Sequence, residues 1–158
     1  MIFRIVILCI SFSIFPISGW AFEIDGFTNN MSKKEVENNL VNWNFDKIDH
    51  KGDSILAYDK PDKTSARLYV FSFENNKLVS VQKDFRPNIK GLIMLFDKFS
   101  KVYGSPSSYD SGSDLSTAGE SKFIAFIWST KSDTIEMTYT VFESNDQLSV
   151  RYRMRNLR

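Results

Sequence analysis

Apolar residues recur at helical spacing between residues 88 and 103. They lie three or four positions apart, which places them on one side of an α-helix: Ile89, Leu92, Ile93, Phe96, Phe99 and Tyr103. Asn88 can cap the start of this helix, and Gly104 followed by Pro106 can end it. Strand-like stretches lie on both sides of it. The pattern therefore predicts a helix from Asn88 to Tyr103 as the central layer element of an α+β domain.

A second helix is predicted from Lys33 to about Val41. Ser32 and Glu35 have the spacing of a capping box, in which each side chain accepts from the backbone N–H of the other residue.

Alternating or continuous apolar patterns predict strands in the rest of the chain. The predicted strands cover residues 22–27, 43–48, 54–58, 67–74, 77–85, 122–128, 133–142 and 147–155. The pair Asn75-Asn76 predicts a two-residue hairpin, because asparagine tolerates positive φ. Residues 105–121 contain Pro, Gly and Ser with few apolar residues, which predicts a mobile loop.

The alternation also predicts which side chains share a face. Tyr69, Phe71 and Phe73 fall on one face of their strand. In the following strand the residues predicted to share a face are Val79, Val81 and Phe85.

These elements predict one α+β domain over residues 22–158. Its antiparallel sheet has about six to eight strands, with two helices on one face. Residues 67–73 lie about 55 positions before residues 122–128, and the two stretches share a similar apolar pattern. A tandem repeat of one helix-plus-meander unit is therefore an alternative that the sequence leaves open.

Residues 1–21 have the three parts of a secretory signal peptide. Arg4 gives a positive start, residues 5–17 are apolar, and Gly19 and Ala21 occupy the −3 and −1 positions. We expect cleavage after Ala21 and a periplasmic or secreted location in a bacterium. An uncleaved anchor is less favoured, because a bilayer requires roughly 20 apolar residues and Pro16 interrupts this run. No stable membrane insertion is expected after cleavage.

The composition narrows the possible functions. The single cysteine, Cys9, lies in the leader, so the rest of the chain has no disulfide, which suits a bacterial envelope protein better than a small eukaryotic extracellular domain. The chain has 20 Lys and Arg against 19 Asp and Glu, and the leader carries Arg4, so the remainder is formally neutral. Nucleic acid is therefore not an expected partner.

Catalytic and metal-binding motifs are sparse. His50 is the single histidine, in a predicted turn over residues 49–53, where a metal site with Asp46 is conceivable but a solvated turn is favoured. The run Asp110–Asp114 lacks the third acidic position and terminal glutamate of a calcium loop. No cofactor is expected. A small carboxylate-dependent hydrolase is kept as a less favoured alternative.

The last predicted strand carries a stripe of arginines. Arg151, Arg153 and Arg155 fall on one face and Arg158 follows, an arrangement suited to bidentate capture of carboxylates on an acidic protein partner. These four arginines are the predicted binding residues. The alternative is a solvated strand face on which the arginines pair with Glu136 and neighbouring threonines, and on which their charge keeps a sheet edge from aggregating.

Three features together resemble a known group of small exported α+β domains. They are Met31-Ser32-Lys-Lys-Glu35-Val36 soon after the expected mature start, the helix exit Tyr103-Gly104-Ser105-Pro106, and a closing antiparallel meander. The chain resembles the β-lactamase-inhibitor-protein-like group and the small lipoprotein of the outer-membrane barrel assembly machinery. The resemblance implies non-enzymatic protein binding through a sheet face or loops, and it transfers no functional residue.

The leading hypothesis is therefore an exported, non-enzymatic protein-binding module, such as an inhibitor or immunity protein against a secreted effector. An envelope scaffold or assembly accessory of the same fold is the alternative. The candidate contacts are the arginine face, the loop at residues 107–120 and the turn at residues 49–53.

Overall fold

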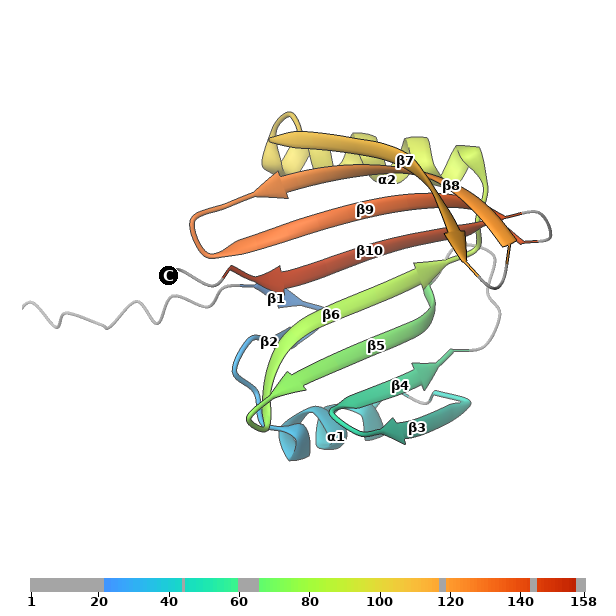
Figure 1. Cartoon of the computed structure of the whole chain (residues 1–158). Coiled ribbons are helices and arrows are strands. Elements are labelled where there is room, and N and C mark those ends of the chain that lie inside the picture. Colours follow the sequence, from blue (N-terminus) through green and yellow to red (C-terminus); the bar gives the residue numbers. More distant parts are fainter. Residues whose placement is uncertain (1–21, 44, 60–65, 117–118, 143–144, 156–158) are drawn as a thin grey trace, which may run out of the picture.

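The computed structural model describes residues 22–43, 45–59, 66–116, 119–142 and 145–155, without the side chains of residues 66, 67 and 114–116. Within these residues two helices and ten strands follow one another, and Figure 1 shows their arrangement. Their bounds are β1 Glu23–Ile24, β2 Phe27–Thr28, α1 Lys33–Val41, β3 Lys47–Lys51, β4 Ser54–Tyr58, β5 Ala66–Glu74, β6 Lys77–Phe85, α2 Ile89–Tyr103, β7 Ser108–Ser116, β8 Gly119–Ser129, β9 Asp133–Phe142 and β10 Gln147–Met154.

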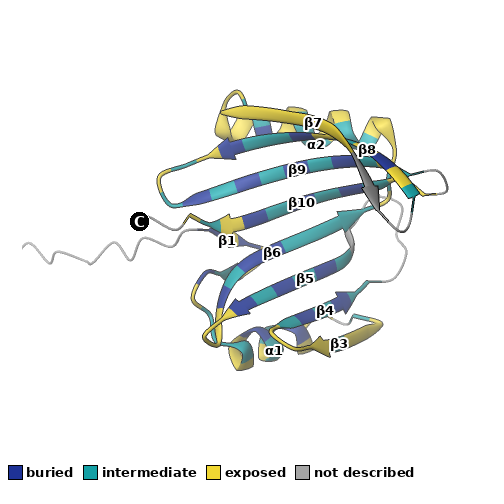
Figure 2. Ribbon diagram, viewed as in Figure 1, coloured by how far each residue is buried: buried dark blue, intermediate teal, exposed yellow. Residues whose placement is uncertain are grey.

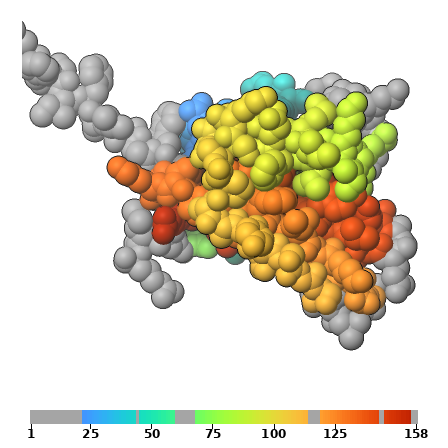
Figure 3. Space-filling model, turned by 90° about the horizontal axis from the view of Figure 1, so that it is seen from above, coloured from blue at the N-terminus to red at the C-terminus, as the bar shows by residue number. Residues whose placement is uncertain are grey.

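Eight of the strands form one antiparallel sheet in the order β3-β4-β5-β6-β10-β9-β8-β7. β1 and β2 form a separate two-stranded hairpin. In the space-filling view, α1 (cyan) and α2 (yellow-green) lie toward the same side of the strands (Figure 3). The α+β class, the antiparallel sheet and the two helices on one face are thus as predicted.

The core lies between the helices and this face of the sheet. Val36 and Leu40 of α1 and Phe99 of α2 belong to one cluster of buried residues, together with inward side chains of the strands. Phe96 and Phe99 contact the Trp128 ring, at centroid distances of 5.9 and 5.6 Å. The opposite face of the sheet, here called the open face, is covered by neither helix.

The capping and turn predictions are confirmed. Ser32 Oγ accepts from the Glu35 N–H at 3.3 Å, and Glu35 Oε2 accepts from the Ser32 N–H at 2.7 Å, completing the capping box of α1. Asn75 and Asn76 turn between β5 and β6 with φ of 50° and 62°, the left-handed values that a tight hairpin requires.

The ends of α2 are also as predicted, but its buried face is rotated from the expected one. Asn88 Oδ1 accepts from the Gly91 N–H at 2.6 Å. The side chains of α2 that pack on the core are Leu92, Leu95, Phe96 and Phe99. Three residues predicted to be inward are exposed: Ile89 at 59%, Ile93 at 62% and Tyr103 at 41%. Two further apolar residues of this helix are also exposed, so apolar spacing alone indicated too wide a buried face.

The loop predicted at residues 105–121 is wrong over most of its length. Residues 108–116 form β7, which pairs with β8 from Ser108↔Ile127 to Ser116↔Gly119. β7 is an edge strand, and its side chains are exposed from Ser108 to Ser113 (Figure 2). It needs no apolar alternation because backbone hydrogen bonds to β8 hold it, so a pattern-based prediction missed it.

The order of elements repeats once, as a helix followed by a four-stranded meander. The last strands of the two meanders, β6 and β10, pair at the centre of the sheet, and the earlier strands of each meander follow outward on either side. By position β5 corresponds to β9 and β4 to β8. The 55-residue register suggested by sequence instead matches β5 with β8, strands at different positions in their halves, so that register is wrong.

A β-bulge in β6 changes which of its side chains share a face, so the predicted face is partly wrong. Phe73 pairs with Leu78 and Ser72 with Ser80, which leaves Val79 as the extra residue. Leu78 is consequently fully buried in the core, and Val79 borders the open face.

Candidate functional site

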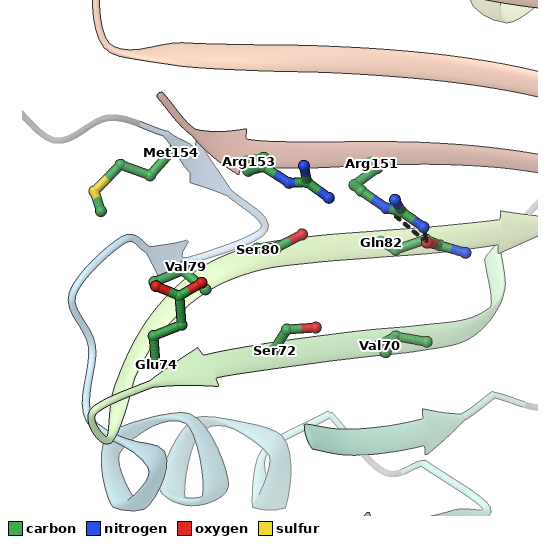
Figure 4. A pocket seen from close by; sticks show the side chains of 9 residues that line it. All are labelled: Val70, Ser72, Glu74, Val79, Ser80, Gln82, Arg151, Arg153 and Met154. Atoms are coloured by element: carbon green, nitrogen blue, oxygen red, sulfur yellow. Dashed lines mark hydrogen bonds between the residues drawn. The ribbon is translucent and has the colours of Figure 1, made fainter. Parts of the chain in front are cut away.

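The open face carries a hollow over its three central strands. Figure 4 shows the side chains that line it. Its volume is about 520 Å³. The strands β5, β6 and β10 supply its walls, with these residues: Val70, Ser72, Glu74, Val79, Ser80, Gln82, Arg151, Arg153 and Met154.

Strand register explains why polar residues from distant parts of the chain meet here. Ser80 of β6 pairs with Ser72 of β5 on one side and with Arg153 of β10 on the other. In the next row, two residues along, Gln82 pairs with Arg151. Since alternate residues of a strand share a face, both rows point outward on the open face.

Arg151 is held by a hydrogen-bonded relay. Its Nε and Nη2 donate to Gln82 Oε1 at 2.9 and 2.6 Å, the contact drawn in Figure 4. Gln82 Nε2 in turn donates to Asp84 Oδ1 at 2.8 Å, and Gln147 Nε2 donates to Asp84 Oδ2 at 3.4 Å. The relay fixes the direction of the Arg151 guanidinium and joins β6 to β10.

Only two of the four predicted binding arginines are shown to lie together on the open face. Arg151 and Arg153 both line the hollow. The guanidinium of Arg155 donates from Nη1 to the Thr130 carbonyl at 3.2 Å and does not line the hollow. β10 ends at Met154, so the strand alternation does not continue to Arg155. Arg158 lies outside the described residues.

Of the two arginines that line the hollow, Arg153 is the one whose guanidinium is available to a ligand. Within the described part of the chain its guanidinium makes no hydrogen bond or ion pair, and the side chain is exposed. The predicted alternative is contradicted in one respect: although Arg153 is solvated, the arginines do not pair with Glu136. Glu136 is opposite Arg151 in register, but Arg151 bonds to Gln82, and Glu136 Oε1 accepts from Thr138 Oγ1 at 3.3 Å.

Sequence reasoning missed the residues of β5 and β6 that complete the hollow. Ser80 follows the bulged residue Val79 and is itself only 8% exposed. The outward orientation of Ser72 could have been assigned from the sequence, since it alternates with the buried Phe71 and Phe73. The position of the two serines beside Arg153 could not, because it depends on the pairing of β6 with β10 across about 70 residues.

The weaker candidates take other positions. His50 lies in β3 and not in a turn, and its Nδ1 is 3.4 Å from Glu37 Oε1 of α1. The run Asp110–Asp114 is extended strand in β7, unlike a calcium-binding loop. Among the described residues there is no group of three or more His, Cys, Asp or Glu side chains that could hold a metal ion.

Asp84 gives a pH-dependent prediction. Burial raises the pKa of this carboxyl, while hydrogen bonds from Gln82 and Gln147 and the charge of Arg151 oppose the rise. The folded state therefore holds the Asp84 proton more tightly than the unfolded state, and its ionisation lowers stability as pH rises above the ordinary value of roughly 4.

We therefore expect Asp84→Asn to be more stable than the natural protein at pH 7, and the gain to vanish below about pH 4. Urea unfolding at several pH values measures it. Glu23→Gln, which removes an exposed carboxylate on β1, is the control. A less stable Asp84→Asn at pH 7 would mean that the charge of Asp84 on Arg151 outweighs its burial.

A scan against protein-family models, a search of curated proteins and a search of solved structures give no match to this chain. Within the part of the chain that the structure describes, no helix has the length and apolar character needed to cross a membrane.

Proposed function

We propose that the protein is an exported, non-enzymatic binding module that recognises an acidic segment of another protein on its open face. The observation that carries the proposal is the hollow beside Arg153. A guanidinium without a partner among the described residues stands there next to a second guanidinium that is already oriented.

The chemistry of the hollow suits a carboxylate. Guanidinium groups bind carboxylates in a bidentate manner, and the hydroxyls of Ser72 and Ser80 can add neutral hydrogen bonds. Arg151 is pre-oriented by Gln82, so less side-chain entropy is lost when an anion binds.

A binding role is favoured over carboxylate-dependent hydrolysis at this site. General acid and base catalysis of the glycosidase type needs two acidic groups. Among the described residues lining the hollow, Glu74 is the single acidic one. The inhibitor and scaffold alternatives use the same surface and differ only in the identity of the partner.

The proposal is tested by affinity capture from envelope and secreted fractions of the source organism. The protein carries a C-terminal tag, because the leader is expected to be removed, and the eluate is identified by mass spectrometry. We expect one partner in stoichiometric amount, and Arg153→Glu should lower its measured affinity by about 2 kcal/mol or more, as for an interface hot spot. The partner's identity would separate an inhibitor from an assembly scaffold.

The matched control is Lys34→Glu with Lys51→Glu, which reverses two exposed charges on α1 and β3. It should leave the affinity unchanged. If Arg153→Glu and the control bind equally well, the open face is not the contact. Folding of each variant is checked by circular dichroism.

A further inference from the structure

A second hollow lies on the helix side of the sheet, between α2 and the strands β6 and β10. It is a groove of about 400 Å³, within the range of small-molecule sites. Its walls are mainly apolar and come from Phe85, Met94, Leu95 and Leu148. Leu148 is fully buried, whereas Met94 is 61% exposed at the mouth. Asn88 and Gly91, at the start of α2, also line the groove.

The rim of this groove carries only positive charge. Arg86, Lys90 and Lys98 line it, and no acidic residue does so among the described ones. Within the described part of the chain none of these three cations forms an ion pair. In a chain whose total charge is close to zero, this is a local concentration of uncompensated charge.

We propose that this groove binds a single-chain anionic amphiphile, an aliphatic carboxylate of the fatty-acid type. The apolar walls take the chain, and the carboxylate lies at the rim, where the two lysine ammonium groups and Arg86 can hold it. The positive charge of the rim favours an anionic ligand. A neutral alkane would leave the three cations unpaired, and a cationic amphiphile would be repelled. The site is separate from the open face and does not depend on the protein-binding role.

The test is isothermal titration of the purified protein with octanoate and decanoate below their micelle concentrations. We expect saturable binding of one molecule per chain. Affinity should rise about fourfold for each added methylene while the groove has room. Decanol, with the same chain and no charge, should bind at least about tenfold more weakly.

Two variants locate the site. Lys90→Gln with Lys98→Gln should weaken decanoate binding by about tenfold or more. Met94→Asp should also weaken it, and because the Met94 side chain is largely exposed, this substitution should leave the fold intact. Lys34→Gln with Lys51→Gln removes the same charge from α1 and β3 and should change nothing.

Several results would overturn the proposal. One is equal affinity for decanol and decanoate, and another is unchanged binding in the groove variants. Binding to vesicles of anionic phospholipid without binding of monomeric decanoate would assign α2 to a membrane surface instead. Concentration-dependent dimerisation that Met94→Asp abolishes would assign the groove to a second copy of the chain.

Discussion

Trp128→Ala is expected to lower the free energy of unfolding by about 3–5 kcal/mol, the range for truncation of a buried aromatic side chain. Trp128 is 2% exposed, and its ring lies between β8 and α2, in contact with Phe96 and Phe99. Its Nε1–H also donates to the Gly104 carbonyl at 2.9 Å, where α2 ends. The substitution therefore opens a cavity and leaves that carbonyl without its partner.

Trp128→Phe is the matched control. It keeps most of the ring packing and loses the hydrogen bond, so we expect a loss of only about 1–2 kcal/mol. Urea unfolding followed by far-ultraviolet circular dichroism measures both values. Equal losses in the two variants would mean that the hydrogen bond to Gly104, and not the packing, is the main contribution of this side chain.

The same variant tests whether the two halves unfold as one domain. Trp43 lies in the first half, with its ring 5.7 Å from Phe27 and stacked on Phe45 at 6.0 Å. Trp20 lies in the expected leader, so in leader-free Trp128→Ala the tryptophan fluorescence comes from Trp43 and reports on the half that was not mutated. Because the buried residues of both halves form one cluster and β6 pairs with β10, we expect the Trp43 transition to shift together with the circular dichroism. Two separated transitions would contradict the prediction of a single domain.

Local chemistry explains why much of the fold was predictable. Ser32 pairs with Glu35, Asn88 caps the start of α2 through Gly91, Gly104 ends α2 through Ser100, and Asn75 with Asn76 forms a tight turn. Each of these contacts lies within a few residues of sequence. Such signals need no knowledge of the tertiary structure, so both helices and the central hairpin were found with nearly correct bounds.

The errors arose where distant parts of the chain decide the outcome. β7 is held by backbone pairing with β8, and its exposed serines carry no apolar period. Val79 leaves its expected face because a bulge shifts the register against β5. For α2, apolar spacing could not show that Ile89 and Ile93 face solvent, since only the position of the sheet defines the buried side.

The candidate site was predictable to the same extent. Alternation placed Arg151 and Arg153 on one face correctly, because both lie within β10. It failed for Arg155, which follows the end of the strand and bonds to Thr130. Gln82, which orients Arg151, is 69 positions away in sequence, and nothing local marks it as a partner.

A second large effect on stability is expected at the ion pair between β6 and the β1–β2 turn. Lys83 of β6 forms an ion pair with Asp25 of the β1–β2 turn, and its ammonium lies over the Tyr69 ring, 5.4 Å from the centroid. The Lys83 side chain is 12% exposed and that of Asp25 33%. Tyr69 Oη also donates to Asp25 Oδ2 at 3.4 Å. The contact fastens the amino-terminal hairpin to the sheet.

We expect Asp25→Asn to lower the free energy of unfolding by about 2 kcal/mol at pH 7. That is less than the 3–5 kcal/mol of a fully buried broken pair, because Asp25 remains partly solvated. Lys83→Met should cost about 1 kcal/mol, since it leaves the more exposed partner alone. The double variant should be more stable than the sum of the two losses predicts, and a double-mutant cycle by urea unfolding measures that coupling. Strict additivity would mean that the two groups do not interact in solution.

The loss in Asp25→Asn should also depend on pH. Burial lowers the pKa of Lys83, and the hydrogen bond and charge of Asp25 oppose that lowering. Between its lowered folded pKa and the unfolded value of about 10.4, Lys83 is protonated in the unfolded state and loses its proton in the folded state, so its contribution to stability rises with pH in that window. Without Asp25 the folded pKa of Lys83 falls further, and that rise begins at lower pH. The difference between Asp25→Asn and the natural protein should therefore shrink from pH 7 toward pH 9.5, because a neutral amine no longer needs the carboxylate. A difference that stays constant over this range would show that Asp25 acts through its hydrogen bond to Tyr69 and not through the charge of Lys83.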